Sequence, residues 1–316
     1  MALVLIALFA VKLGIQTPGV QIPMLKVKPE AEFLVAGPPE SLLVEPSAIW
    51  ISNRVKNTLE RVDPKANKLG EPVSGFAQPC AAPQLGFGNV WVLNCADGAL
   101  ARVDTKAGKV LRSIKTGVGS ARAGLAVSPD SLWAFTDDKT TLARFDPTQD
   151  KIVGELRLPA GCNSIVFGEG SLWVTCPAEN RVLQIDPNLN TVSKRIEVSA
   201  EPFAVSVGEG AVWVFCRKDG KVERIDPKTG KVAKTIELSV PNTDGDIAAG
   251  EGSVWVSLPG FPISRIDPKT DKVVQQFAGE GGGCIRTGQG AIWLGNVKQS
   301  TVWRLDPRRV AATLAE

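Results

Sequence analysis

Residues 203–238 have the sequence FAVSVGEGAVWVFCRKDGKVERIDPKTGKVAKTIEL, which contains four short runs rich in apolar residues. Three turn signals separate these runs: Gly-Glu-Gly at 208–210, Arg-Lys-Asp-Gly at 217–220 and Asp-Pro-Lys-Thr-Gly at 226–230. Glycine supplies a positive φ, and proline after aspartate presets a type I turn, so each signal favours a hairpin. We therefore predict four antiparallel strands, at Phe203–Val207, Ala211–Phe215, Val222–Ile225 and Val232–Leu238.

The same pattern recurs along the whole chain. A tryptophan inside an apolar triplet marks each copy, at spacings of 38 to 42 residues: Trp50, Trp91, Trp133, Trp173, Trp213, Trp255 and Trp293. An aspartate follows each of them by 12 or 13 residues: Asp63, Asp104, Asp146, Asp186, Asp226, Asp267 and Asp306. A repeated four-stranded antiparallel unit of about 40 residues is typical of a β-propeller blade. The sequence predicts an all-β, seven-bladed β-propeller of four-stranded antiparallel blades.

The first 16 residues resemble a signal peptide. Ala2–Val11 is an unbroken apolar run of ten residues, which is too short to span a bilayer and matches the hydrophobic part of a secretory signal. No Lys or Arg precedes the run and no clear cleavage site follows it, so a retained anchor and a mis-assigned start are the alternatives. No later segment is long and apolar enough to be transmembrane.

Residues 17–29 are rich in Pro and Gly, and we expect an irregular leader there. Residues 30–316 are expected to form a single propeller domain. Two segments compete to supply the last strand of blade seven, Glu32–Val35 and Val310–Leu314. We favour the first of these and expect the C-terminal tail to be short and frayed.

The composition excludes several kinds of chemistry. The 316 residues include no His and no Tyr, so Ser-His-Asp and Cys-His enzymes are excluded, as are histidine-built metal sites. Lys and Arg number 36 against 33 Asp and Glu, a net charge of +3. This excess is too small to indicate a nucleic-acid partner or an anionic membrane surface.

The cysteine spacing predicts two disulfides within blades. Cys162 and Cys176 lie 11 residues before and 3 after their tryptophan, which places them opposite each other across the first hairpin. Cys80 and Cys95 are one residue out of that register, which a β-bulge can absorb. We expect Cys216 and Cys284 to be free, buried thiols. Disulfides agree with an oxidising compartment, periplasmic or extracellular. A four-cysteine metal site is a less favoured alternative, since no Cys-x-x-Cys pair occurs.

Residues that recur in every copy are expected to be structural. The seven tryptophans should pack between neighbouring blades. An arginine two residues before the repeated aspartate should pair with it while the carboxylate caps the turn. These arginines are Arg61, Arg102, Arg144, Arg224, Arg265 and Arg304, with Gln184 at the equivalent position of blade four.

Residues that break the repeat are the functional candidates, because propeller loops at one mouth of the channel carry function. The positions closest to the axis hold mostly small or apolar residues, and Arg286, Gln84 and Asp246 depart from this. The adjoining loops add further charges. Arg54 and the candidate Arg217 each follow the second strand of their blade, at the same mouth of the channel. We predict a polar pocket between blades three, five, six and seven. The candidate ligand-binding residues are Arg286, Asp246, Asp244, Glu280, Arg122, Arg217 and Gln84.

Two interpretations of this pocket stay open. Its arginines can hold a carboxylate or phosphate bidentately. Alternatively, Arg286 and Asp246 pair across adjacent blades and simply fill the channel. The segment Glu280–Gly283, which contains three consecutive glycines, is expected to be unusually flexible.

The motifs Gly-Glu-Gly-Ser-Leu-Trp-Val at 168–174 and Arg-Ile-Asp-Pro-Lys-Thr-Gly-Lys-Val at 224–232 resemble those of the streptogramin lyase (virginiamycin B lyase)-like propellers, related to YVTN-repeat proteins. The resemblance covers residues 30–316. It implies a seven-bladed fold and a lyase that opens a cyclic depsipeptide ester with a catalytic histidine and magnesium. This chain has no histidine, and Gln289 occupies the loop before the last repeated tryptophan. No catalytic residue of the family transfers to this sequence.

We favour a monomeric, non-catalytic binding propeller, secreted or periplasmic, that engages a small anionic ligand or a protein partner and needs no cofactor. The alternative is a histidine-free lyase or hydrolase with Asp246 or Glu280 as base and Arg286 stabilising developing negative charge. Channel carboxylates could also hold Ca²⁺ or Mg²⁺, although no spaced Asp-x-Asp-x-Asp loop occurs. We expect no nucleic-acid partner.

Overall fold

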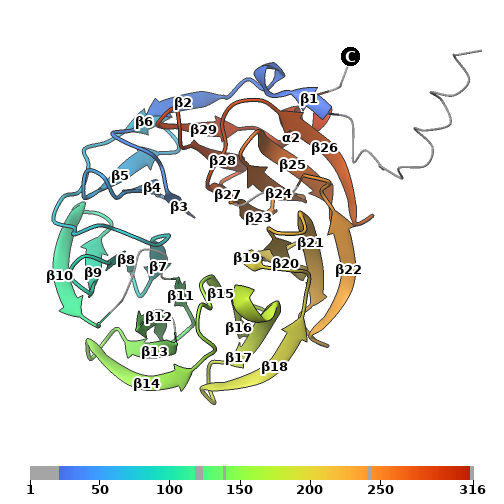
Figure 1. Cartoon of the computed structure of the whole chain (residues 1–316). Helices are drawn as coiled ribbons and strands as arrows, with labels where there is room; N and C mark the ends of the chain where they lie inside the picture. Colours follow the sequence, from blue (N-terminus) through green and yellow to red (C-terminus); the bar gives the residue numbers. More distant parts are fainter. Residues whose placement is uncertain (1–20, 118–123, 138–139, 241–243, 314–316) are drawn as a thin grey trace, which may run out of the picture.

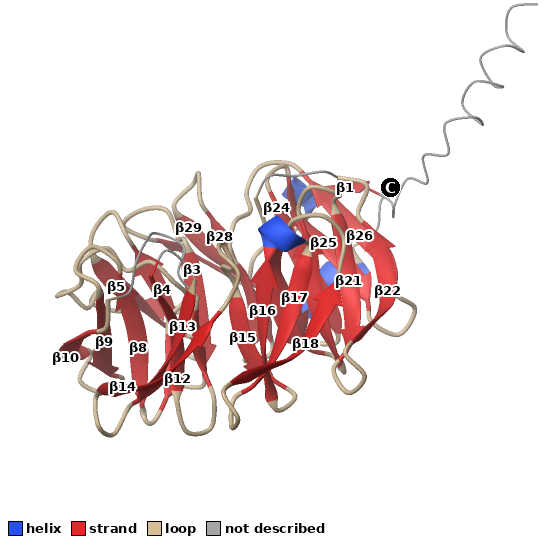
Figure 2. Ribbon diagram, turned by 60° about the horizontal axis from the view of Figure 1, so that its bottom comes forward, coloured by secondary structure: helices blue, strands red, loops and turns tan. Residues whose placement is uncertain are grey.

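The computed structural model describes residues 21–117, 124–137, 140–240 and 244–313. Seven sheets stand side by side in a ring, and in each the strand that precedes the tryptophan-bearing strand is innermost (Figure 1). The predicted seven-bladed propeller of antiparallel blades is confirmed. Turned on its side, the ring is a disc whose strands run between two loop-covered faces (Figure 2). No helix in the described segments is long and apolar enough to cross a membrane.

The blades follow one another in chain order. Blades one to four consist of β3 (Ser41–Glu45), β4 (Ala48–Asn53), β5 (Thr58–Asp63) and β6 (Lys68–Leu69); β7 (Gln84–Gly86), β8 (Asn89–Asn94), β9 (Ala99–Asp104) and β10 (Lys109–Lys115); β11 (Leu125–Val127), β12 (Leu132–Asp137), β13 (Thr141–Asp146) and β14 (Lys151–Arg157); β15 (Ile165–Gly168), β16 (Ser171–Cys176), β17 (Arg181–Asp186) and β18 (Thr191–Glu197). A 3-10 turn, η2 (Pro177–Glu179), follows β16.

Blade five matches its predicted strands to within two residues. Blades five to seven consist of β19 (Pro202–Gly208), β20 (Ala211–Cys216), β21 (Lys221–Asp226) and β22 (Lys231–Glu237); β23 (Asp246–Gly250), β24 (Ser253–Leu258), β25 (Phe261–Asp267) and β26 (Lys272–Ala278); β27 (Ile285–Gly288), β28 (Ala291–Asn296), β29 (Thr301–Leu305) and β2 (Ala31–Leu34).

The repeated tryptophans form the core between blades, as predicted, and all seven are 0% exposed. Each of these seven buried indole N–H groups has a local acceptor five residues earlier in the chain, so burial leaves none of the seven unpaired. In five blades this acceptor is the carbonyl of a glycine, as for Trp213 and Gly208 at 3.0 Å. Blade three uses the Ser128 hydroxyl and blade one the Glu45 carboxylate.

The repeated arginines do not pair with the aspartate two residues later, which corrects that expectation for the described part of the chain. Each lies opposite the tryptophan on the neighbouring strand, as Arg224 does with Trp213. The guanidinium carbons lie 5.4–6.0 Å from the indole centroids, a cation–π geometry. Arg224 then reaches Asp271 of the next blade at 3.0 Å. The aspartates instead cap their own turns. Asp226, for example, accepts hydrogen bonds from the backbone N–H groups of Lys228 and Thr229.

The N-terminal strand β2 closes the ring, as we favoured, by pairing antiparallel with β29. The C-terminal segment is not frayed as far as Thr313, where the described residues end. It forms the short helix α2 (Pro307–Ala312), which begins where the Asp306 carboxylate accepts from Arg308 N–H at 2.8 Å and proline occupies the first turn. Gln275 of β26 donates to three carbonyls at the end of this helix and fixes it to blade six.

The irregular leader is also corrected from Gln21 onward. Strand β1 (Gln21–Pro23) runs parallel to β26 and adds a fifth strand to blade six, and the 3-10 turn η1 (Met24–Lys26) follows it. Ile22 and Met24 are buried in the core of blades six and seven. Only this tertiary partner, about 250 residues later in the chain, orders a segment that has no periodicity of its own. The signal-peptide-like residues 1–16 lie outside the described residues.

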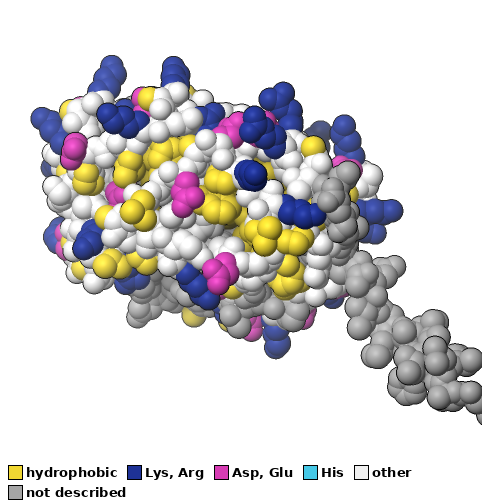
Figure 3. Space-filling model, turned by 90° about the horizontal axis from the view of Figure 1, so that it is seen from above, with side chains coloured by type: hydrophobic (Ala, Val, Ile, Leu, Met, Phe, Trp, Pro, Cys, Tyr) yellow, Lys and Arg dark blue, Asp and Glu magenta, His cyan; other side chains and the backbone are white. Residues whose placement is uncertain are grey.

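On the edge shown in Figure 3, Lys and Arg side chains are scattered among acidic and apolar ones rather than gathered in one patch.

Candidate functional site

An open cavity of 1020 Å³ occupies the centre of the ring. Its walls are the segments entering the innermost strands and several loops that follow the second strands, and all seven blades contribute. This is the mouth at which we predicted a site. Its volume lies at the upper end of the range of about 300–1,000 Å³ that is usual for small-molecule pockets.

The charged residues of the described cavity wall all belong to blades six, seven and one. They comprise four carboxylates and three cations: Asp244, Asp246, Glu280, Glu40, Arg286, Lys298 and Arg54. We call this part of the wall the charged half. Because both signs occur with one acidic residue in excess, it is not a simple anion-attracting surface.

Asp246 and Arg286 form an ion pair that joins β23 to β27. Arg286 Nη1 donates to Asp246 Oδ2 at 2.5 Å and to the Ile285 carbonyl at 2.6 Å. Asp246 also accepts from the N–H groups of Ile285, at 3.0 Å, and Ile247, at 2.9 Å. The side chains of Arg286 and Asp246 are 32% and 20% exposed. The expected pairing is therefore present, and the pair also lines the cavity.

Among the described residues, every hydrogen bond of Arg286 uses Nη1. A guanidinium offers five donors in a rigid plane, and two parallel N–H groups hold a carboxylate bidentately. The edge formed by Nη2 and Nε is the part of Arg286 that can meet a ligand.

The segment around Glu280 is held firmly, which corrects the expectation of unusual flexibility. Gly279 N–H donates to the Gly260 carbonyl, Gly282 N–H to Asn296 Oδ1 and Gly283 N–H to Ser257 Oγ, each at 3.0 Å. Gly281 and Gly282 have φ of 110° and 93°, where a side chain is strained. Glycine is needed here for the backbone conformation and for close packing.

Three other candidates have different outcomes. Asp244 lines the cavity and accepts from Gly245 N–H at 3.0 Å. Gln84 also lines it and donates to the Ala82 carbonyl at 3.4 Å. Arg122 lies outside the described residues.

Arg217 is absent from the described cavity wall. Its guanidinium carbon lies 4.7 Å from the ring centroid of Phe203, and its Nε donates to Glu201 at 2.8 Å. Phe203 does line the cavity, so Arg217 supports an aromatic part of the wall. Alignment of the repeats did not reveal Glu40 and Lys298, which also line the cavity. Their only sequence signal is a charge, which lies in the segment entering an inner strand for Glu40 and in the loop following a second strand for Lys298.

Blades two to five supply a wall without charge in the described residues. We call it the neutral half. Apolar side chains such as Leu125, Ile165 and Phe203 alternate there with the polar groups of Gln84, Asn163 and Ser164. A wall of this kind favours the apolar part of a ligand.

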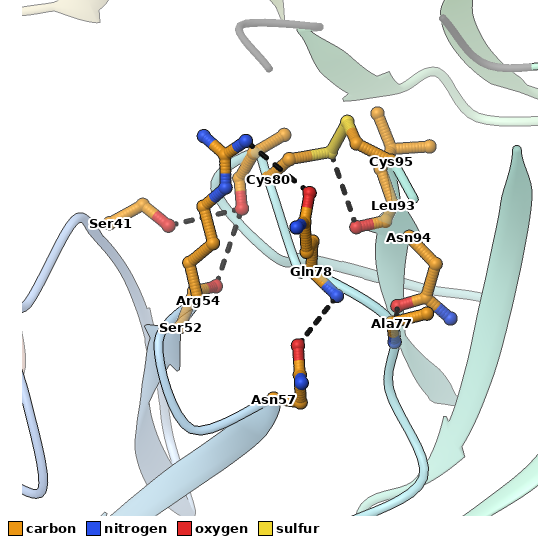
Figure 4. The surroundings of a disulfide bond; sticks show 11 residues. Ser41, Ser52, Arg54, Asn57, Ala77, Gln78, Cys80, Leu93, Asn94 and Cys95 are labelled. Carbon is orange, nitrogen blue, oxygen red and sulfur yellow. Dashed lines mark hydrogen bonds between the residues drawn. A yellow bond between two sulfur atoms is a disulfide. The ribbon is translucent and has the colours of Figure 1, made fainter. Parts of the chain in front are cut away.

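Both predicted disulfides are confirmed, and both lie in blades that supply the neutral half, although only Cys80 borders the cavity itself. Cys80 pairs with Cys95, and Cys162 with Cys176. Each joins a segment entering an inner strand to the end of the second strand or the loop after it. Figure 4 shows the first disulfide near Ser41 and Ser52 of blade one. The hydroxyls of both serines donate to the carbonyl of Ala81, the residue after Cys80.

The remaining cysteines are free and buried, as predicted. Cys284 also borders the cavity, and its Sγ donates to the Pro39 carbonyl at 3.3 Å. Burial raises the pKa of the Cys284 thiol to about 12, so it stays protonated and unreactive near neutral pH. The described residues contain no group of three or more Cys, Asp or Glu placed to hold a metal ion.

Comparisons with known proteins support the propeller fold. No family model and no curated protein matches the chain. Solved structures do: virginiamycin B lyase from Staphylococcus aureus is 19% identical with a TM-score of 0.74, covering 87% of this chain and 98% of that one. Hydrazine synthase from Kuenenia stuttgartiensis is 16% identical with a TM-score of 0.72, covering 88% and 97%. The Pan2 WD40 domain from Neurospora crassa is 12% identical with a TM-score of 0.68, covering 86% and 90%. At these identities the likeness shows a shared propeller fold.

Proposed function

We propose that this protein is a secreted or periplasmic binding propeller that holds a small anionic ligand on Arg286 and does not catalyse a reaction. The observation that carries the proposal is the placement of Arg286, fixed through Nη1 in the wall of a central cavity. An arginine held in this way loses little conformational freedom when it binds, because its position is set before the ligand arrives. The two disulfides support an oxidising compartment.

The absence of histidine supports a binding role over catalysis. Asp246, which we considered as a base, already accepts hydrogen bonds at both carboxylate oxygens. A carboxylate engaged in this way holds the two blades together and has little capacity left to take a substrate proton.

A histidine-free lyase or hydrolase is the second candidate, and the shared fold with virginiamycin B lyase favours it. One of the similar structures is a catalytically inactive variant of that enzyme, with a histidine replaced by alanine, together with quinupristin; it is 19% identical to this chain. Glu280 would be the base in this chain. Incubation of the protein with quinupristin, followed by mass spectrometry, tests this candidate: ring-opened product that disappears in Glu280→Gln supports it, and intact quinupristin contradicts it.

The binding proposal is tested by thermal unfolding with organic acids, sugars and phosphorylated metabolites. Wild type is compared with Arg286→Ala and with Arg224→Ala as a matched control. Arg224 is similarly placed, 29% exposed and paired with an aspartate that is 20% exposed, but it lies outside the central cavity. A ligand that binds only the folded state stabilises it by about 2.7 kcal/mol at a hundredfold excess over Kd.

We expect an anion to stabilise wild type and Arg224→Ala but not Arg286→Ala. Equal stabilisation of all three proteins would place binding elsewhere. If no anion stabilises wild type, the proposal of a small anionic ligand is wrong, and a protein partner becomes the candidate.

A further inference from the structure

The cavity is suited to more than an anion, because its described charges are unbalanced toward acid. Beside Arg286, the charged half presents the carboxylate of Glu280, which is exposed and has no ion-pair or hydrogen-bond partner for its side chain among the described residues. A ligand with negative charge alone would satisfy the arginine and leave the Glu280 carboxylate, on the same wall, facing a like charge. A ligand that also carries a positive group relieves that repulsion.

The backbone that carries Glu280 is set in place before any ligand binds. Hydrogen bonds hold Gly279 to blade six and Gly282 to Asn296 of blade seven. Arg286 follows Glu280 by six residues and is fixed by Asp246. A cation site and an anion site therefore lie on one short, well-held segment, and neither needs a loop rearrangement.

The other side of the cavity has a different chemistry. Blades four and five present Ile165, Val166 and Phe203, with the uncharged polar groups of Asn163 and Ser164 between them. Phe203 is kept in place by the arginine stacked on it. This wall can cover apolar side chains while its amide and hydroxyl groups meet backbone-like polar atoms.

From these observations we infer that the ligand is zwitterionic with an apolar body, and that a short linear peptide with free termini has the required chemistry. The inference rests on the proposed function and names the ligand class of the same site. The peptide carboxylate binds Arg286, its ammonium group faces Glu280, and its apolar side chains lie against blades four and five. A cavity of 1020 Å³ has room for several residues.

The experiment uses a library of all tripeptides that combine Ala, Leu and Phe, prepared in four forms: free, N-acetylated, C-amidated and blocked at both ends. Binding to the full chain is measured by native mass spectrometry and then by calorimetry for the tightest sequence. Hexanoate serves as an anion without an amine. The proteins are wild type, Arg286→Ala, Glu280→Gln and the control Glu155→Gln, whose residue is exposed on outer strand β14.

We expect the free peptide to bind about tenfold or more tightly than either singly blocked form. Glu280→Gln should abolish the preference for a free amine while keeping the preference for a free carboxylate, and Arg286→Ala should do the reverse. Glu155→Gln should behave as wild type.

The ligand class fails separately from the proposed function. Equal binding of free and acetylated peptides, or of hexanoate and peptide, would overturn the zwitterion and leave the anion site standing. If anions stabilise the protein through Arg286 but no peptide binds in any form, the peptide inference is wrong. If neither peptides nor anions bind, both proposals fall.

Discussion

The neutral and charged halves of the cavity wall are held together by different means. In the neutral half, two disulfides join the entering segments to the ends of the second strands. In the charged half, the corresponding segments are held by an ion pair and by hydrogen bonds to backbone N–H groups. The half whose charged side chains are placed to meet a ligand has no disulfide in the described residues.

This difference indicates how one repeated blade can serve two purposes. A disulfide holds a segment without regard to the polarity of its neighbours, so the wall beside it can remain apolar. Charged side chains that hold a segment also present charge to the cavity. In blades two and four, the groups that hold the wall segments are therefore different from those that can contact a ligand. In blades six and seven, the same charged side chains can do both.

The largest effect should come from the disulfides. Each closes a short loop, with sequence separations of 15 and 14 residues, so Cys80→Ala/Cys95→Ala and Cys162→Ala/Cys176→Ala should each lower the free energy of unfolding by about 3 kcal/mol. Urea denaturation measures this. The free thiol variant Cys216→Ala, the control, should lose only about 1 kcal/mol. Losses no larger than the control would show that the neutral half does not depend on its disulfides.

Asp246→Ala should cost about 2 kcal/mol, since it leaves Ile285 N–H without its acceptor and Arg286 without its ion-pair partner. Asp246→Asn keeps an acceptor and should recover about half of this loss. Chemical denaturation of both variants gives the comparison. Equal losses would show that the negative charge, rather than the hydrogen-bond acceptor, holds blades six and seven together.

Two glycines with similar backbone conformations separate strain from packing. Gly282 in the charged half has φ of 93°, and a Cβ there would lie 3.0 Å from the Leu258 carbonyl oxygen. Gly161 in the neutral half has φ of 83° with nothing within 4 Å. Gly161→Ala should cost about 1 kcal/mol from strain alone and Gly282→Ala about 2 kcal/mol. Similar losses in thermal unfolding would mean that the segment around Glu280 is less tightly packed than we describe.

The smallest effect should come from the turns between the third and fourth strands, and it should be larger in blade three than in blade six. Hydrogen bonds from the Thr148 side chain and backbone lower the pKa of Asp146, in blade three, to about 2. The Lys269 backbone N–H lowers the pKa of Asp267, in blade six. Because each folded pKa lies below the unfolded value, the stabilisation is present above about pH 4 and is lost as the pH falls through the folded pKa.

Asp146→Asn and Asp267→Asn should each slightly flatten the dependence of Tm on pH between about pH 5 and pH 2. Calorimetry across this range checks the effect. An effect of Asp267→Asn as large as that of Asp146→Asn would contradict this order.

The blade count could be predicted because the bonds that define a blade are local. The Trp213 indole bonds to a carbonyl five residues earlier, and Asp226 caps its own turn. Strand β1 and helix α2 could not be predicted, because both depend on β26. Strand β1 pairs with β26 from a distant part of the sequence. Helix α2 is held by hydrogen bonds from the side chain of Gln275 in β26.

The candidate site was partly predictable for a similar reason. Arg286 and Asp246 break the repeat at positions near the axis, where the fold dictates what a side chain meets. Arg54 and Arg217 hold the same position relative to their tryptophans, yet only Arg54 borders the cavity. Arg217 is drawn to Phe203 and Glu201, neighbours that a position in the repeat does not reveal.

Strand β1 and helix α2 bring both ends of the described chain to the outer edge of blade six (Figure 1). Both described ends therefore lie on the rim of the disc, away from the cavity at its centre. A surface linker attached at this rim would leave the entrance that a ligand must use uncrowded.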